Sequence, residues 1–301
     1  MNIQDINSIF SRHKNDLAFI LGNGINLHYN KDNVSWTDLL LDLWDAHSFN
    51  TQSVIPSGIT LTEFYDILEI QNYARENFSG VLQKDVANRM GKWIPNESQN
   101  LILNKIKNLD SPLLTTNFDN LIPSSLGLDF KKFPDTKFTD YYPWSCYFSD
   151  KDLTNPTEGF GVWYPNGMLK YHRSIKLGLS QYMGNVERAR KLIHKQPENI
   201  SFEGKNQEFW PGYKTWLHIV FNKSLFICGL SLDETEIFIR WLLIERAKYF
   251  RKFPDRKHKG WFVSIKNNSS RDEGKKFFLQ SVGFEIIELN DYQSIYEEIW
   301  K

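Results

Sequence analysis

Five short, largely apolar runs constrain the fold of this 301-residue chain more than any other feature. They cover residues 17–21, 112–116, 224–228, 261–265 and 285–289. Short runs of this kind, bounded by glycine or polar residues, are typical of strands buried on both faces of a parallel sheet. Segments with helical spacing lie between them, such as the long one that places Ile237, Trp241, Ile244 and Ala247 on one face. Alternating strands and helices predict an α/β fold with a doubly wound, parallel sheet.

No repeat, low-complexity tract or flexible linker divides the chain, so we expect a single domain over residues 1–301. Its core strands are expected within about 15–34, 109–125 and 222–301. Ser35 is a candidate cap for the first helix of a helical insertion over about 35–108. Residues 129–215 are rich in aromatic residues and are expected to form mainly loops with short strands. Asp291 is expected to open the last helix.

Composition excludes several classes of protein. The 36 Lys and Arg balance the 36 Asp and Glu, which argues against a basic surface along the whole chain. With only Cys146 and Cys228, the chain cannot form a cysteine-based zinc module or a disulfide framework. The first residues lack the features of a signal peptide, and no apolar run approaches the roughly 20 residues of a membrane span. We therefore expect a cytoplasmic protein that binds no metal and no membrane.

Three polar or glycine-rich motifs directly follow expected strands. They are Gly-Asn-Gly at 22–24, Thr-Thr-Asn-Phe-Asp at 115–119 and Gly-Leu-Ser-Leu-Asp at 229–233. Doubly wound sheets bind ligands at the carboxyl ends of their strands, where glycines let a phosphate approach the backbone closely. Each motif alone is equally compatible with a tight turn or an ordinary helix cap.

In this order, the three motifs resemble those of the SIR2-like family, which includes the sirtuins and bacterial NAD-hydrolysing defence proteins. The resemblance extends from about residue 15 to the last helix, and the block at 115–119 is its most specific part. It implies a Rossmann-like sheet that holds NAD, with a variable helical insertion. Because the zinc module of protein-deacylating sirtuins is missing, the chain is more similar to the zinc-free branch. That branch cleaves the bond between nicotinamide and ribose in anti-phage defence.

The resemblance also assigns roles to residues. Gly22 and Gly24 would approach the phosphates, with Asn26 nearby. Asn117 would position the attacking water or a ribose hydroxyl. The remaining expected cofactor-binding residues are Thr116 and Asp119 on the nicotinamide ribose side, and Gly229, Ser231 and Asp233 on the far side of the cofactor.

One departure from the family pattern concerns the catalytic histidine. Relatives carry Trp-x-x-His-Gly, whereas this chain reads Trp-Tyr-Pro-Asn-Gly at 163–167, which places Asn166 at the histidine position. An amide does not titrate near neutral pH and cannot act as a general base. His172 lies six residues further on and is a candidate replacement.

Two functional hypotheses remain open. The chain is either an NAD glycohydrolase, with slowed or relocated acid–base chemistry, or a catalytically weakened subunit that binds NAD or another nucleotide in a multiprotein defence complex. Related effector proteins are commonly joined to or paired with a sensor, so the resemblance implies a homo-oligomer or a separate sensor protein as partner. A basic, aromatic run at 248–260 allows a third reading, an abortive-infection factor that acts on nucleic acid. We favour a solvated helix end for this run, so direct contact with nucleic acid is not expected.

Overall fold

The computed structural model describes residues 3–30, 33–73, 80–134, 136, 138–197, 200–203, 209–267 and 269–301. Within them, eight strands form one sheet in the order β3-β4-β5-β2-β1-β6-β7-β8. The strands are β1 (Leu17–Leu21), β2 (Leu113–Thr115), β3 (Asp129–Lys132), β4 (Cys146–Ser149), β5 (Val162–Trp163), β6 (Ser224–Cys228), β7 (Gly260–Ile265) and β8 (Glu285–Leu289). All five predicted strands are therefore confirmed, as β1, β2, β6, β7 and β8.

The sheet is mixed rather than wholly parallel. β4 runs antiparallel to both of its neighbours, β3 and β5, and this corrects the expectation of a purely parallel sheet. The other neighbouring strands pair in parallel, with Leu21 of β1 opposite both Thr115 of β2 and Cys228 of β6. Taken in chain order, the parallel strands from β5 to β8 are arranged 3-2-1-4-5-6 across the sheet. The order reverses between β1 and β6, and doubly wound sheets bind ligands beside this reversal.

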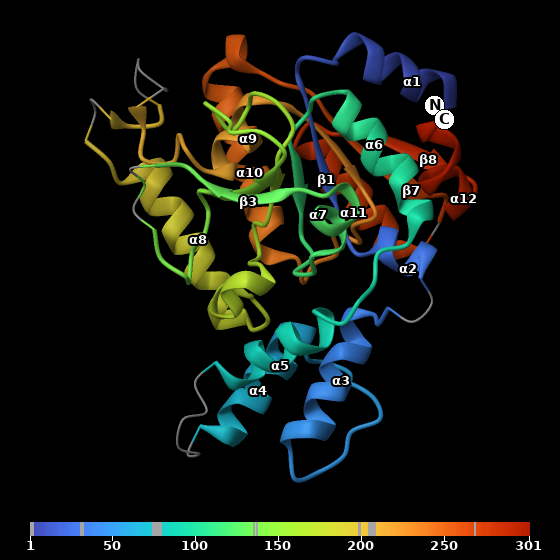
Figure 1. Ribbon diagram of the computed structural model, residues 1–301, viewed down its shortest axis with the longest axis vertical. Helices are drawn as coiled ribbons and strands as arrows, with labels where there is room; N and C mark the ends of the chain where they lie inside the picture. The colour runs from blue at the N-terminus through green and yellow to red at the C-terminus, as the bar shows by residue number, and fades with distance from the viewer. Residues whose placement is uncertain are drawn as a thin grey trace.

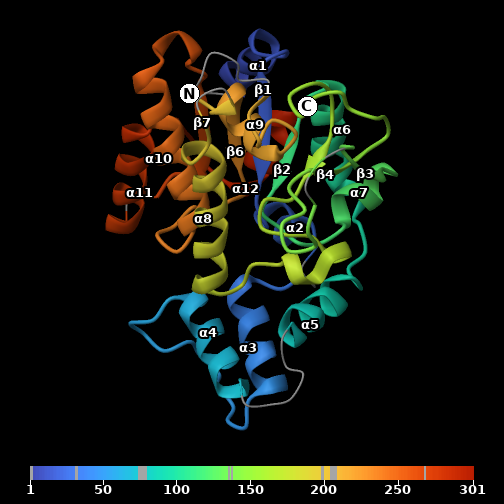
Figure 2. The same cartoon turned by 90° about the vertical axis from the view of Figure 1, so that its left-hand side faces the viewer.

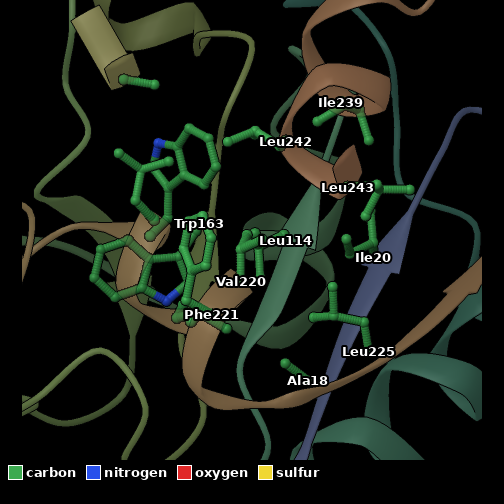
Figure 3. Close-up of a cluster of buried hydrophobic side chains, with 14 of the residues drawn as sticks. Ala18, Ile20, Leu114, Trp163, Val220, Phe221, Leu225, Ile239, Leu242 and Leu243 are labelled. Carbon is green, nitrogen blue, oxygen red and sulfur yellow. The ribbon is translucent and has the colours of Figure 1, made fainter. Parts of the chain in front are cut away.

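Helices cover both faces of the sheet. Alternate residues of β1 point to opposite sides, as the pleat requires, so that Ala18 and Ile20 join one hydrophobic cluster while Leu17, Phe19 and Leu21 join the other. Figure 3 shows the first cluster. Its helices are α8 (Leu179–His194), α9 (Trp216–Asn222), α10 (Ile237–Lys252) and α11 (Ser270–Ser281). The second cluster includes α1 (Ile3–Arg12), α2 (Gly24–Tyr29), α6 (Asn100–Asn108), α7 (Leu121–Leu126) and α12 (Tyr292–Tyr296).

Three helices form a lobe at one end of the molecule (Figures 1 and 2). They are α3 (Trp36–His47), α4 (Leu61–Asn72) and α5 (Val81–Met90), and their buried residues form a separate cluster. The Ser35 hydroxyl accepts a hydrogen bond from the Asp38 amide at 3.1 Å, which confirms the predicted cap of α3. We call α3–α5 the helical lobe. The predicted insertion extended further, to residue 108, but α6 packs on the sheet and does not belong to the lobe.

The structure corrects two further expectations about helices. The region 129–215 contains the 16-residue helix α8 as well as loops and short strands. On α10, the face predicted from Ile237, Trp241, Ile244 and Ala247 is only half-buried; the fully buried side lies one residue on and includes Phe238 and Leu242. Asp291 accepts a hydrogen bond from the Ser294 amide at 2.7 Å and opens α12 as predicted.

The basic run at 248–260 is structured as a helix end followed by a turn. α10 ends at Lys252, a single 3₁₀ turn covers Pro254–Arg256, and β7 begins at Gly260. Within this run the Arg256 guanidinium donates a hydrogen bond to the Tyr249 hydroxyl at 3.0 Å. This geometry favours the interpretation as a helix end.

Candidate functional site

A cavity of about 680 Å³ lies where the loops after β1, β2, β6 and β7 meet the helical lobe. Its size falls within the roughly 300–1,000 Å³ of small-molecule sites. The lobe contributes residues such as Trp36, Thr62 and Met90, so the lobe and the sheet edge enclose the cavity together. Its position beside the reversal between β1 and β6 is the one that the strand order predicts for a ligand.

Most of the predicted site residues meet at this cavity. Those that line it are Gly24, Thr116, Asn117, Asn166, Gly229, Ser231 and Asp233. They come from four separate segments of the chain, and the sheet topology brings them together. Gly22, Asn26, Asp119 and His172 do not line the cavity.

Asn117 and Asn166 both line the cavity, and each has a buried side-chain amide atom without a hydrogen-bond partner in the described part of the chain. Asn117 is 7% exposed and its Nδ2 has no hydrogen-bond partner; Asn166 is 2% exposed and its Oδ1 has none. The backbones of both residues are held in place, because the Asn117 amide donates to the Thr115 hydroxyl and the Asn166 carbonyl accepts from the Lys176 amide. An unsatisfied buried polar atom costs about 1–3 kcal/mol. The two residues that carry such atoms line the same cavity, and this favours a polar ligand there.

Asn26 and Asp119 form a hydrogen-bond network behind this wall. The Asn26 Nδ2 donates to Asp119 Oδ2 at 2.9 Å, and the Leu121 amide donates to Asp119 Oδ1 at 2.9 Å. Gln99 donates in turn to Asn26 Oδ1 at 3.3 Å. Burial raises the pKa of Asp119 from 3.8 to about 6, and the hydrogen bonds oppose this shift only in part. Both residues therefore support the loop that carries Asn117, and neither touches the cavity.

The two glycines after β1 permit a close approach between backbones. A Cβ at Gly22 would overlap the carbonyl of Gly229, and one at Gly24 would overlap the Tyr296 hydroxyl. The Gly22 amide donates to the Cys228 carbonyl at 3.2 Å, and the Gly24 amide donates to the Gly229 carbonyl at 2.9 Å. These amides are engaged within the protein. The expectation that they are free for a phosphate is therefore corrected, although Gly24 itself lines the cavity.

The loop after β6 is a tight turn that faces the cavity. Gly229 has φ +69° and Leu232 has φ +47°, so two residues of the turn adopt the left-handed conformation. Asp233 Oδ1 accepts a hydrogen bond from the Thr235 amide at 3.0 Å, and Ser231 Oγ lies 3.4 Å from Asp233 Oδ2. The Asp233 carboxylate thus shapes the turn while it also lines the cavity.

His172 lies outside the wall of this cavity. It lies in the 3₁₀ segment η2 (Leu169–Ser174), half-exposed, and is not part of the cavity wall. The prediction that it acts as the catalytic base gains no support from the geometry.

Sequence reasoning missed several residues of the wall. Glu236 at the start of α10 lines the cavity, as do Lys266 after β7 and Lys275 on α11. Lys266 follows a predicted strand, the same signal that identified the three motifs. Glu236 could have been identified from its position at the start of a long helix. Glu is not a favoured residue at this capping position, so its presence there indicates another role.

In the described ranges, no three His, Cys, Asp or Glu residues are grouped to hold a metal ion. None of the helices described there is long and apolar enough to cross a membrane. Comparison of the chain with models of known protein families and with curated proteins gave no match.

Proposed function

We propose that the chain is an NAD-binding protein of the sirtuin-like type that hydrolyses the nicotinamide–ribose bond. The observation that carries this proposal is that Asn117 and Asn166 line one cavity and that each has a buried amide atom, Nδ2 and Oδ1, without a hydrogen-bond partner in the described ranges. A carboxamide or a sugar hydroxyl offers both a donor and an acceptor, and so complements this pair. The anti-phage role belongs to the same proposal and rests on the resemblance alone.

The arrangement of the sheet supports a dinucleotide as the ligand. Its parallel strands follow the order of Rossmann-like sheets, in which a dinucleotide lies across the reversal of strand order. The cavity extends from Asn117 on the loop after β2 to Val263–Ile265 at the end of β7. An elongated ligand would place its nicotinamide ribose near Asn117 and its adenine near the end of β7. Lys266 and Lys275 add positive charge to the far part of this wall.

The chemistry requires stabilisation of a positively charged ribose and activation of a water molecule. As nicotinamide leaves, the ribose C1′ becomes electron-deficient, and water attacks it. A side-chain amide such as that of Asn117 can orient water or a ribose hydroxyl without a change in its own charge. The helical lobe forms one side of the cavity, and the partial shielding from bulk water strengthens such interactions.

A second candidate function is nucleotide binding without turnover. Two observations favour it: the family's histidine position holds Asn166, which cannot titrate, and His172 lies outside the cavity wall. In this case the protein binds NAD or a related nucleotide and passes the signal to a partner protein or a second copy of itself.

Nicotinamide release separates the two functions. The purified protein is incubated with NAD, and the products are separated by chromatography, for the wild type, Asn117→Ala, Asn166→His and the exposed control Asn50→Ala. For a hydrolase, we expect release that Asn117→Ala lowers by about 10²-fold or more, while Asn50→Ala has no effect. For a binding subunit, NAD binds without release, and Asn166→His gains activity. A wild type that binds no NAD contradicts both functions.

A further inference from the structure

Glu236 is the one carboxylate of the cavity wall that has no partner within the described part of the chain. It is half-buried and occupies the N-cap position of α10, yet its side chain makes no capping hydrogen bond. Its backbone is fixed, since its amide donates to the Asp233 carbonyl at 3.1 Å and its carbonyl accepts from the Arg240 amide at 3.0 Å. By contrast, the carboxylate of Asp233 binds Thr235, and that of Asp272 pairs with Lys275 at 2.9 Å. The Glu236 carboxylate is therefore free to interact with a ligand or a water molecule.

We propose that Glu236 is the general base of the hydrolysis and takes the place of the imidazole that Asn166 lacks. The inference rests on the proposed function, and it places Asp233 and Glu236 beside the nicotinamide ribose instead of on the far side of the cofactor. The water oxygen forms a bond to C1′ of the nicotinamide ribose while the C1′–N bond breaks. The electron pair of that bond leaves with nicotinamide and neutralises its positive ring. The proton of the water passes to a carboxylate oxygen of Glu236 and then to solvent, so the products are nicotinamide, ADP-ribose and one proton.

The groups around Glu236 match this role. Asp233 on the preceding loop adds negative charge, and Tyr182 on α8 lies near enough for the Glu236 charge to act on its phenol. Arg240, one turn along α10, is turned away: its guanidinium donates to the Leu232 carbonyl at 3.1 Å and lies 3.9 Å from the centre of the Phe278 ring. Lys266 and Lys275 line the same cavity but are held by Asn290 and Asp272.

These surroundings favour the protonated form of the Glu236 carboxyl group. Burial, with a smaller contribution from the charge of Asp233, raises the pKa of Glu236 from 4.5 to about 7. A general base works best when its pKa lies near the working pH. Burial also raises the pKa of Tyr182 well above its usual range, so its hydroxyl stays neutral.

The test compares Glu236→Gln with Glu234→Gln. Gln has the shape of Glu but accepts no proton, and Glu234 is an exposed neighbour that pairs with Arg271 outside the cavity. We expect kcat/KM for nicotinamide release to rise with pH through an inflection near 7 in the wild type and in Glu234→Gln. In Glu236→Gln, we expect kcat/KM to fall by about 10²–10⁴-fold and the inflection to disappear. Glu236→Asp, with a shorter carboxylate, should be slower and still show an inflection, and thermal melting checks that each variant is folded.

Calorimetry with carba-NAD, an NAD analogue with carbon in place of the ring oxygen of the nicotinamide ribose, provides a readout that does not depend on turnover. Binding in two buffers of different ionisation enthalpy reports the protons exchanged, and we expect net exchange near pH 7 in the wild type and a clear reduction in Glu236→Gln. Folded, active Glu236→Gln that keeps the wild-type inflection overturns the role of Glu236 and leaves the proposed function standing. NAD that binds without cleavage at any pH also overturns this role and favours the binding subunit. A wild type that binds no NAD contradicts the proposed function itself.

Discussion

At the scale of single residues, the site separates groups that face the cavity from groups that hold them in place. Asn117 and Asn166 carry unpartnered amide atoms at the wall, whereas the neighbouring Asp119 has both carboxylate oxygens bonded inside the protein. The motif Thr-Thr-Asn-Phe-Asp therefore serves two purposes within five residues. Its Asn lines the cavity, and its Asp fixes the loop through Asn26.

Asp119 should give folding a characteristic pH dependence. Its pKa is about 6 when folded, against about 3.9 in an unfolded chain, so between these values only the folded state holds the proton. The free energy of unfolding therefore falls as the pH rises through this window, by up to about 3 kcal/mol from this group. Asp119→Asn should make the profile less steep between pH 4 and 6, as measured by urea unfolding, while Glu236, whose pKa is also raised, keeps part of the slope. Asp129→Asn, at an exposed position, is the control. Identical plots of the free energy of unfolding against pH for the wild type and Asp119→Asn would contradict the argument.

At the scale of elements, apolar side chains from outside the helical lobe enter its core and tie it to the sheet. Phe118 follows β2 but packs into the cluster of the lobe, where its ring centre lies 5.9 Å from that of Trp36. Ile175 and Leu177 enter the same cluster from the loop before α8. The residue between Asn117 and Asp119 thus joins the lobe to the loop that carries the candidate site.

Phe118→Ala should loosen the lobe more than the sheet. Truncation of a buried Phe costs about 3–5 kcal/mol, and this cost falls on the cluster that holds α3, α4 and α5 together. We expect faster hydrogen exchange in the lobe helices and little change in β1 and β6, measured by mass spectrometry. Phe277→Ala removes a side chain that is 75% exposed and is the control. Equal loss of protection in lobe and strands would show that the two unfold together.

The sequence predicted elements better than their arrangement. Runs such as 224–228 identified strands because their burial leaves an uninterrupted apolar signal. Helix α8 was missed because its buried side is made of Tyr182, Asn185, Ala189 and Ile193, a weakly apolar set. The antiparallel β4 and the exclusion of His172 from the cavity depend on pairings between distant segments. Periodicity along a chain carries no information about such pairings.

At the scale of the whole molecule, the two ends of the parallel strands have different roles. The cavity lies at the carboxyl ends of the strands, and the buried cation Arg246 lies at the amino ends of β6 and β7. Arg246 is 1% exposed and donates to the carbonyls of Val220 at 2.9 Å, Lys223 at 3.1 Å, His258 at 3.3 Å and Lys259 at 2.8 Å. One side chain thus satisfies the backbone of the segments that lead into two neighbouring strands.

Arg246→Met should therefore reduce stability without altering the site. The substitution keeps an apolar stem but leaves several buried carbonyls unsatisfied, each at about 1–3 kcal/mol, so we expect a loss on the order of 3 kcal/mol or more in urea unfolding. Arg251→Met, an exposed change on the same helix, should have little effect. Well below the unfolding midpoint, NAD affinity measured by calorimetry should match that of the wild type, because the affected carbonyls lie at the edge opposite the cavity. A large loss of NAD affinity in folded Arg246→Met would show instead that the amino and carboxyl ends of the strands are energetically coupled.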